Sequence, residues 1–188
     1  MKPHRPLLLC SASPRRREFL ERLGIPFALS PAHLDETQRN GEPPLTYVLR
    51  MAVEKAAAGG RAGAVALAAD TIVVAGDEVL GKPADRPDAM RILRRISGIE
   101  HRVITAVCVG ARAIAVETRV KFARLSEAQI RWLVESGDGD DKAGAYAVQG
   151  LAGAFVERID GSVSNVVGLP LKETLDLLSE AGVELPWA

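Results

Sequence analysis

Residues 7–17 read LLLCSASPRRR, an apolar run that passes through small residues into a proline and three arginines. The leucines favour a buried strand that ends at Cys10, and Ser13 followed by Pro14 is typical of the N-cap and first residue of a helix. Such a turn brings free backbone amides and the positive end of the helix dipole together. With arginines beside it, the turn is predicted to bind an anion. The alternative is a helix start whose arginines are only solvated.

Composition restricts the classes of partner. The chain has 188 residues, of which 47% are hydrophobic and 26% charged, so it is long and apolar enough to bury a core. Lysine plus arginine and aspartate plus glutamate number 24 each, so no global field is expected to attract nucleic acid or an acidic membrane. Aromatic residues make up only 4%, which argues against a groove that stacks single-stranded bases. Any anion binding is therefore predicted to be local.

Cysteine use and hydropathy predict a location. Cys10 and Cys108 lie far apart in apolar runs without CxxC spacing, and buried, reduced cysteines are typical of cytosolic proteins. No apolar run is long enough to cross a bilayer, because residues 63–69 are soon followed by Asp70. The expectation is a soluble, cytoplasmic protein that does not bind membranes.

Strand and helix patterns alternate along the chain. The opening reads β-α-β-α, with strands at 7–10 and 27–30 and a second helix at 45–58. Residues 101–109 are apolar on both faces, which favours a central strand, whereas residues 114–122 favour a strand with one solvated face. Further strands are expected at residues 65–69, 72–74, 78–80 and 154–159. Further helices are expected after Pro87, from the capping box of Ser126 and Gln129 to about residue 136, and from Pro170.

Residues 76–83 nearly match the P-loop spacing, but a P-loop is rejected here. Pro83 replaces the hydroxyl residue that binds magnesium, and Asp77 and Glu78 would repel a phosphate. Lys82 is still able to reach an anion as a point charge; the alternative is an ordinary surface lysine.

Two groups of carboxylates offer further chemistry. Asp70 follows the apolar residues 65–69 and is expected at a strand end, in a partly desolvated position, and Thr71 adds a hydroxyl. Asp35 and Glu36 lie in a polar loop. A carboxylate that faces arginines and lysines can orient a divalent cation or deprotonate water. The alternative for Asp70 is a turn-forming aspartate.

Residues 141–150 read DKAGAYAVQG and suit neither an amphipathic helix nor a plain strand. Small residues let the backbone approach a flat ligand closely, while Gln149 can read donors and acceptors on a base edge and Tyr146 can pack against it. Residues 161–170 form a second loop of this kind.

Together these residues resemble the Maf family of nucleoside triphosphate pyrophosphatases, which is related in fold to the inosine triphosphatase group. The resemblance spans nearly the whole chain and departs from the family pattern at Asp138-Gly139, where the family commonly has Glu-Pro, and at Val163, where an aromatic residue is frequent. The matching motifs are SASPRR from Ser11, Asp35-Glu36, Glu54-Lys55, Ala69-Asp70-Thr71, Gly81-Lys82-Pro83, His101 with Thr105, residues 141–150 and residues 164–170.

The resemblance implies a fold, an activity and a set of site residues. The fold would be α/β, a mixed twisted sheet flanked by helices with two lobes around a nucleotide cleft, in a single Maf-like domain over residues 1–188; family members look dimeric, so a homodimer is possible. The reaction would convert a nucleoside triphosphate to the monophosphate and pyrophosphate. Asp70 would activate water, and Mg²⁺ or Mn²⁺ would join the phosphates to Glu36 and Asp70. The implied substrate-binding residues are Ser11, Arg15, Arg16, Lys55, Thr71, Lys82 and Gln149, of which Arg16, Lys55 and Lys82 would neutralise phosphates.

Substrate choice in the family goes with the residues that match Arg15, Thr71 and Gln149. Ala69-Asp70-Thr71 looks like the branch that acts on dTTP and UTP, whereas a Ser-Asp-Gln triplet is expected for the branch that acts on 7-methyl-GTP. Besides a 7-methyl-GTP pyrophosphatase, a nucleotide-sensing module in division control and a single-stranded nucleic-acid binder are the other hypotheses. The intact set of Asp70, Lys55 and Lys82 favours turnover over sensing.

Overall fold

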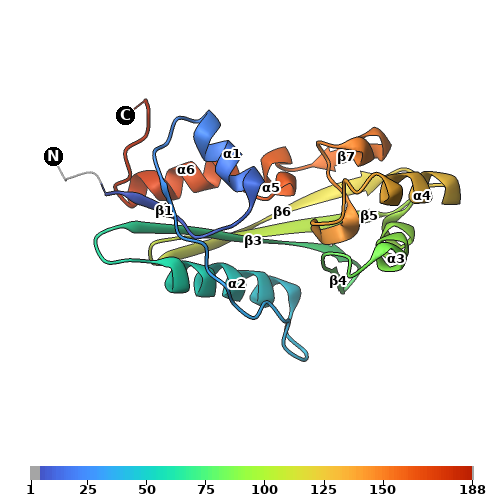
Figure 1. Cartoon of the computed structure of the whole chain (residues 1–188), viewed down its shortest axis with the longest axis horizontal. Helices are drawn as coiled ribbons and strands as arrows, with labels where there is room; N and C mark the ends of the chain where they lie inside the picture. Colours follow the sequence, from blue (N-terminus) through green and yellow to red (C-terminus); the bar gives the residue numbers. More distant parts are fainter. Residues whose placement is uncertain (1–4, 188) are drawn as a thin grey trace. The chain divides into compact units, whose positions relative to one another are not determined.

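A computed structural model describes residues 5–187 as an α/β fold built on a seven-stranded sheet with helices on its faces (Figure 1). The strand order is β2-β1-β3-β5-β6-β7, with β4 beside β3; β1 pairs in parallel with β2 and β3, whereas β3–β4 and β6–β7 are antiparallel. This confirms the predicted mixed sheet. The elements are β1 (Leu7–Leu9), α1 (Pro14–Arg22), β2 (Ala28–Leu29), α2 (Pro44–Gly59), β3 (Val65–Ala75), β4 (Glu78–Leu80), α3 (Arg86–Ile96), β5 (Glu100–Val109), β6 (Arg112–Phe122), α4 (Glu127–Glu135), η1 (Ala143–Ala145), η2 (Leu151–Phe155), β7 (Val156–Asp160), α5 (Val163–Val167) and α6 (Leu171–Glu180).

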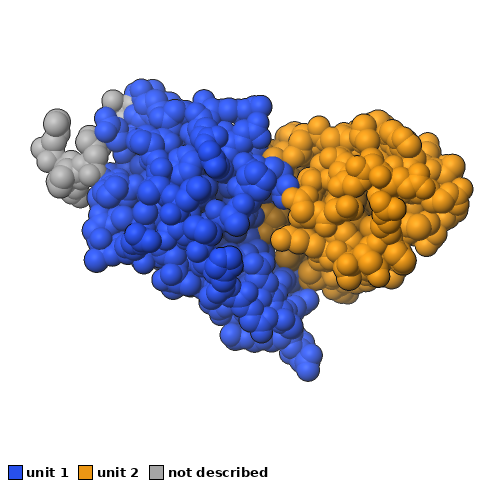
Figure 2. All heavy atoms as spheres, viewed as in Figure 1, with its two compact units in different colours: residues 1–70, 105–116, 168–188 blue, residues 71–104, 117–167 orange. Residues whose placement is uncertain are grey.

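The chain divides into two compact units (Figure 2). Unit 1 comprises residues 1–70, 105–116 and 168–188, and unit 2 comprises residues 71–104 and 117–167. Each unit has its own hydrophobic core. In the part of the chain that the structure describes, none of the helices has the length and apolar character needed to cross a membrane.

In unit 1, different helices cover the two faces of the sheet (Figure 1). Leu9 of β1 and Leu67 of β3 pack into one core with Leu20 of α1 and Leu178 of α6. Successive residues of a strand point to opposite faces of the sheet. The strand residues that alternate with Leu9 and Leu67 therefore point toward α2. Helix α2 buries Met51 on this other side of the sheet.

In unit 2, α3 and α4 pack together over the core and are joined at the surface by a two-point ion pair. Nε and Nη2 of Arg94 each lie 2.8 Å from a carboxylate oxygen of Glu127. The predicted capping box at the start of α4 is confirmed, because Ser126 and Gln129 each bond the backbone amide of the other. Within the core, the rings of His101, Phe122 and Tyr146 make mutual edge or tilted contacts.

Three features differ from the sequence-based expectation. The predicted strands at 65–69 and 72–74 form one strand, β3, because its first half pairs with β1 and its second half with β4. Asp70 therefore lies inside a strand and not at its end. The predicted strand at 154–159 begins only at Val156, after the 3-10 helix η2, and residues 163–167 of the expected loop form the short helix α5.

Candidate active site

Asp70 meets Lys55 on the face of β3 that carries α2. In β3, Leu67 and Ala69 point into the core of unit 1. By the alternation of a strand, Asp70 points to the opposite face, where α2 lies. There Nζ of Lys55 donates to Oδ1 of Asp70 at 2.7 Å, and each residue is only 8% exposed. An ion pair this far from solvent is expected to be ordered, because both charges would be costly to bury alone.

The same ammonium holds a second carboxylate. Nζ of Lys55 lies 2.9 Å from Oε2 of Glu36, which belongs to the loop between β2 and α2. The Glu36 side chain is 48% exposed, whereas that of Asp70 is 11% exposed. Lys55 therefore joins one buried and one accessible carboxylate.

Helix α2 also fixes the backbone of the Glu36 loop. The Tyr47 hydroxyl donates to the carbonyl oxygen of Glu36 at 2.7 Å, and Nη2 of Arg50 donates to the carbonyl oxygen of Thr37 at 3.2 Å. Burial, with the negative charges of Asp70 and Glu36 adding to it, raises the pKa of Tyr47 to about 12. Tyr47 was not among the residues singled out from sequence, although its spacing of eight from Lys55 in a helix predicts a shared face.

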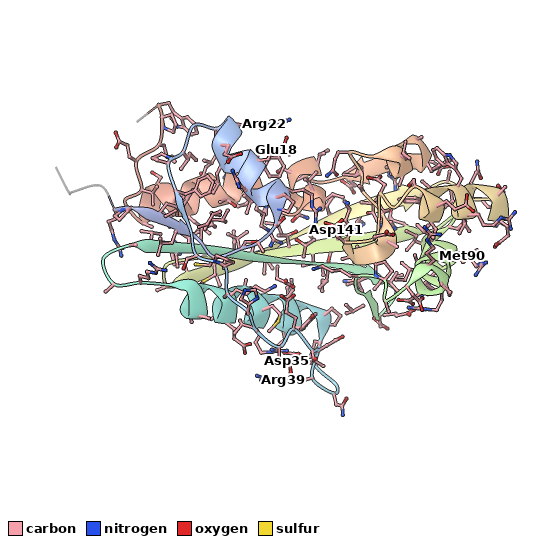
Figure 3. All side chains as sticks on the ribbon, in the orientation of Figure 1. Glu18, Arg22, Asp35, Arg39, Met90 and Asp141 are labelled. Atoms are coloured by element: carbon pink, nitrogen blue, oxygen red, sulfur yellow. The ribbon has the colours of Figure 1, made fainter. Side chains whose placement is uncertain are left out.

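The far end of this loop is held by Glu42. Nε and Nη2 of Arg50 lie 2.6 and 2.7 Å from the two carboxylate oxygens of Glu42. This two-point pair lowers the pKa of Glu42 to about 2. Figure 3 shows Asp35 and Arg39 on the same loop before α2. The loop that presents Glu36 is thus tied to α2 at several points.

Arg16 connects the first strand-to-helix turn with a distant carbonyl. It lies on α1 and is 9% exposed. Its Nη1 donates to Oγ of Ser11 at 3.0 Å, and its Nε donates to the carbonyl oxygen of Gly168 at 2.8 Å. Burial lowers the pKa of Arg16, while the nearby negative charges of Asp70 and Glu36 act in the opposite direction. The two carboxylates that Lys55 contacts therefore also act to raise the pKa of Arg16, against the larger effect of burial.

The predicted turn at residues 11–14 is formed as expected, with one difference. Ser13 is the N-cap residue and Pro14 opens α1, but the Ser13 side chain makes no capping bond. Instead, the backbone amide of Ser13 donates to Oγ of Ser11 at 3.2 Å. Arg15, which is half-buried, follows directly on α1. Ser11 therefore organises this turn by bonding both Ser13 and Arg16.

The other predicted site residues lie in unit 2. Thr71 follows Asp70 in β3, so its side chain and that of Asp70 point to opposite faces of the strand. Lys82 is exposed in the turn after β4, and Gln149 is exposed between η1 and η2. The amide of Gly144 donates to the carbonyl oxygen of Gly81 at 3.1 Å, which ties the turn that carries Lys82 to the segment that carries Gln149.

The structure thus brings together Ser11 with Arg16, and Glu36 with Lys55 and Asp70. Within residues 5–187, no group of three or more His, Cys, Asp or Glu side chains is arranged to hold a metal ion. Chemically, unit 1 presents a buried carboxylate beside a desolvated ammonium and a buried guanidinium. This arrangement suits a polyanion together with proton transfer to a carboxylate.

The chain is similar to known proteins over nearly its whole length. The model of a family described as Maf-like protein matches residues 6–181, which include every predicted site residue. The chain belongs to the Maf family. A relative from Anaeromyxobacter dehalogenans (strain 2CP-1), named dTTP/UTP pyrophosphatase, is 57% identical over 189 aligned residues. The alignment covers 96% of this chain and 96% of the relative. Relatives of the same name from Myxococcus xanthus and Hahella chejuensis are 50% and 48% identical, with 96% of this chain and 95% and 94% of theirs covered.

Proposed function

We propose that this chain hydrolyses dTTP and UTP to the nucleoside monophosphate and pyrophosphate. The observation that carries the proposal is the buried Lys55–Asp70 pair, with the buried Arg16 guanidinium held by Ser11 and Gly168 in the same unit. The shared name of its relatives supports the same substrates. Neither a stacking groove nor an apolar ligand explains charges buried at such cost.

The residues suggest how the reaction proceeds. Asp70 accepts a proton from a water molecule as the water oxygen forms a bond to the α-phosphorus. The bond from that phosphorus to the bridging oxygen breaks, and pyrophosphate leaves with the electron pair. Arg16 and Lys55 stabilise the charge that develops on the leaving group, and Lys82 adds a further positive charge to the triphosphate. Ser11 keeps the Arg16 guanidinium oriented through the hydrogen bond of 3.0 Å.

Glu36 and Asp70 also fit a divalent cation. Both carboxylates already point at one cation, the Lys55 ammonium, and Mg²⁺ is commonly held by one or two carboxylates plus substrate phosphates. When bound, Mg²⁺ or Mn²⁺ would polarise phosphate oxygens and neutralise their charge. The Glu36 side chain is 48% exposed, so a cation from solvent could reach it.

Base choice is assigned to Arg15, Thr71 and Gln149. The Gln149 amide offers a donor NH2 group beside an acceptor carbonyl oxygen, which suits the alternating carbonyl and NH groups of uracil and thymine. Cytosine inverts part of that pattern, so a mismatched pair would be left. The whole of residues 1–188 is proposed to act as one Maf-like domain.

A nucleotide panel tests the proposal. Pyrophosphate release is measured from dTTP, UTP, CTP, ATP, GTP and 7-methyl-GTP, with and without Mg²⁺. We expect dTTP and UTP to be hydrolysed well ahead of the others and only with the metal. Preference for 7-methyl-GTP would move the chain to the other branch. Tight nucleotide binding without pyrophosphate release would instead identify a sensing module.

A further inference from the structure

Gln149 lies in a tight turn of unit 2. The amide of Gly150 donates to the carbonyl oxygen of Ala147 at 3.1 Å, so residues 147–150 form one turn with Gln149 near its tip. We call these residues the Gln149 turn. The exposed side-chain amide of Gln149 can select a base only if the backbone that carries it is held in place. A side chain on a mobile backbone would adapt to the hydrogen-bond pattern of cytosine as well as to that of uracil or thymine.

The chain that enters the Gln149 turn is held by a buried hydrogen bond. Nε2 of His101 and the hydroxyl of Tyr146 are 2.9 Å apart, and both residues are nearly inaccessible to solvent. Just before Tyr146, Gly144 and Ala145 have φ angles of 75° and 56°. Ala145 is the one non-glycine residue with positive φ among residues 5–187. Such a backbone persists only when its surroundings fix it.

The chain that leaves the turn is held by Asp138. Oδ2 of Asp138 accepts the backbone amide of Leu151 at 3.0 Å. A Cβ atom at Gly150 would overlap this carboxylate, and a Cβ atom at Gly139 would overlap the carbonyl group of Ala145. The dipeptide Asp138-Gly139 therefore touches the polypeptide on both sides of the Gln149 turn.

Asp138 is itself anchored to a rigid element. Its backbone amide donates to Oγ of Ser136 at 3.2 Å, and that hydroxyl donates to the carbonyl oxygen of Leu133 in α4 at 2.6 Å. The ammonium of Lys142 donates to the carbonyl oxygen of Asp138. Figure 3 places Asp141 on the same connection after α4. A carboxylate fixed in this way can restrain the residues that it bonds.

We propose that Asp138 is a positioning residue for base selectivity, which acts by holding the Leu151 amide and thereby the Gln149 turn. This inference rests on the proposed function, because it assumes that Gln149 reads the base. Gly139, which has no Cβ atom, allows this connection to approach the carbonyl group of Ala145 closely.

Three variants test the role of Asp138. Asp138→Ala removes the acceptor, Asp138→Asn keeps an acceptor oxygen without the charge, and Asp140→Ala removes the same charge two residues away. We measure kcat and KM for dTTP and CTP. Asp138→Ala should reduce the dTTP-to-CTP ratio of kcat/KM about tenfold, mainly through the KM for dTTP, while Asp138→Asn and Asp140→Ala stay within about threefold of the parent.

Amide hydrogen exchange provides a readout that does not depend on turnover. Exchange at residues 147–151 should be faster by about tenfold or more in Asp138→Ala and unchanged in Asp140→Ala. Unchanged exchange and an unchanged selectivity ratio in Asp138→Ala would overturn the proposal, as would an equal effect of Asp140→Ala. If the parent protein released no pyrophosphate, the proposed function would fail. Exchange alone would then show whether Asp138 fixes the turn.

Discussion

Nζ of Lys55 lies 2.7 Å from Oδ1 of Asp70 inside the protein and 2.9 Å from Oε2 of Glu36 near the surface. The ammonium has therefore already lost most of its water before any ligand arrives. The cost of removing water from the Lys55 ammonium is therefore met by folding and does not fall on the binding of a triphosphate. Removal of Asp70 or Lys55 would leave its partner less well compensated, so the two residues are expected to depend on one another.

Asp70→Asn tests the proton acceptor. Asparagine keeps the shape of the side chain and an oxygen for Lys55, but it cannot take a proton from water. We expect pyrophosphate release to fall by about a hundredfold or more while the circular dichroism spectrum is kept. Asp77→Asn, in the exposed turn before β4, is the matched control and should stay near the parent rate. A rate near that of the parent for Asp70→Asn would remove Asp70 from the mechanism.

Arg16→Ala and Lys82→Ala should differ in stability although both weaken catalysis. Each substitution removes a positively charged side chain that is proposed to bind the triphosphate, so KM should rise and kcat should fall. Arg16 is buried and bonds Ser11 and Gly168, so its loss should also cost about 1–3 kcal/mol of unfolding free energy. Lys82 is exposed, and its loss should change stability by less than about 0.5 kcal/mol. Steady-state kinetics and urea unfolding separate the two effects; full activity in both variants would make these residues ordinary surface and core charges.

Gln149→Ala should flatten base preference more than it lowers the best rate. The side chain is exposed, so its truncation should leave the fold intact. Loss of a matched donor and acceptor pair should reduce discrimination between dTTP and CTP by roughly tenfold to a hundredfold. The measurement is kcat/KM for dTTP, UTP and CTP in both proteins. Leu151→Ala, which shortens an exposed side chain directly after this turn and keeps the backbone amide, is the control. Selectivity that survives Gln149→Ala would contradict the assignment.

His101 predicts a loss of stability in acid. Burial lowers the pKa of His101 from 6.5 to about 4, although the charge of Glu100 opposes the shift. The unfolded chain therefore binds a proton below pH 6.5 that the folded chain takes up only near pH 4. The contribution of neutral His101 to the free energy of unfolding is therefore complete above pH 6.5 and is lost as the pH falls toward 4. Between pH 7.5 and pH 5 it should amount to about 2 kcal/mol.

Urea unfolding at the two pH values measures this contribution. In a His101→Gln variant, which keeps a polar group near the Tyr146 hydroxyl, the pH-dependent loss should be smaller by that amount. His33→Gln, in the loop before α2, is the control and should keep the parental pH dependence. An identical loss in the parent and in His101→Gln would show that other groups are responsible.

Much of this fold could be predicted because its signals are local. Patterns within a few residues predict a strand at 7–10, observed at 7–9, and the helix opened by Pro14. They also predict the capping box of Ser126 and the central position of residues 101–109. Membership of the Maf family followed from ordered motifs along the whole chain and is confirmed. Local hydrogen bonding and periodicity require no knowledge of distant partners.

The sequence by itself determined which residue types were present at the site: Asp70, Lys55, Arg16 and Glu36. Only the tertiary structure decided how they combine. Asp70 was expected at a strand end, but the pairing of β3 with β1 and then β4 continues the strand through it and turns its side chain toward α2. The contacts of Lys55 with Glu36 and of Asp138 with Leu151 join residues 19 and 13 positions apart. Such contacts arise from strand pairing and chain reversal, which no local pattern encodes.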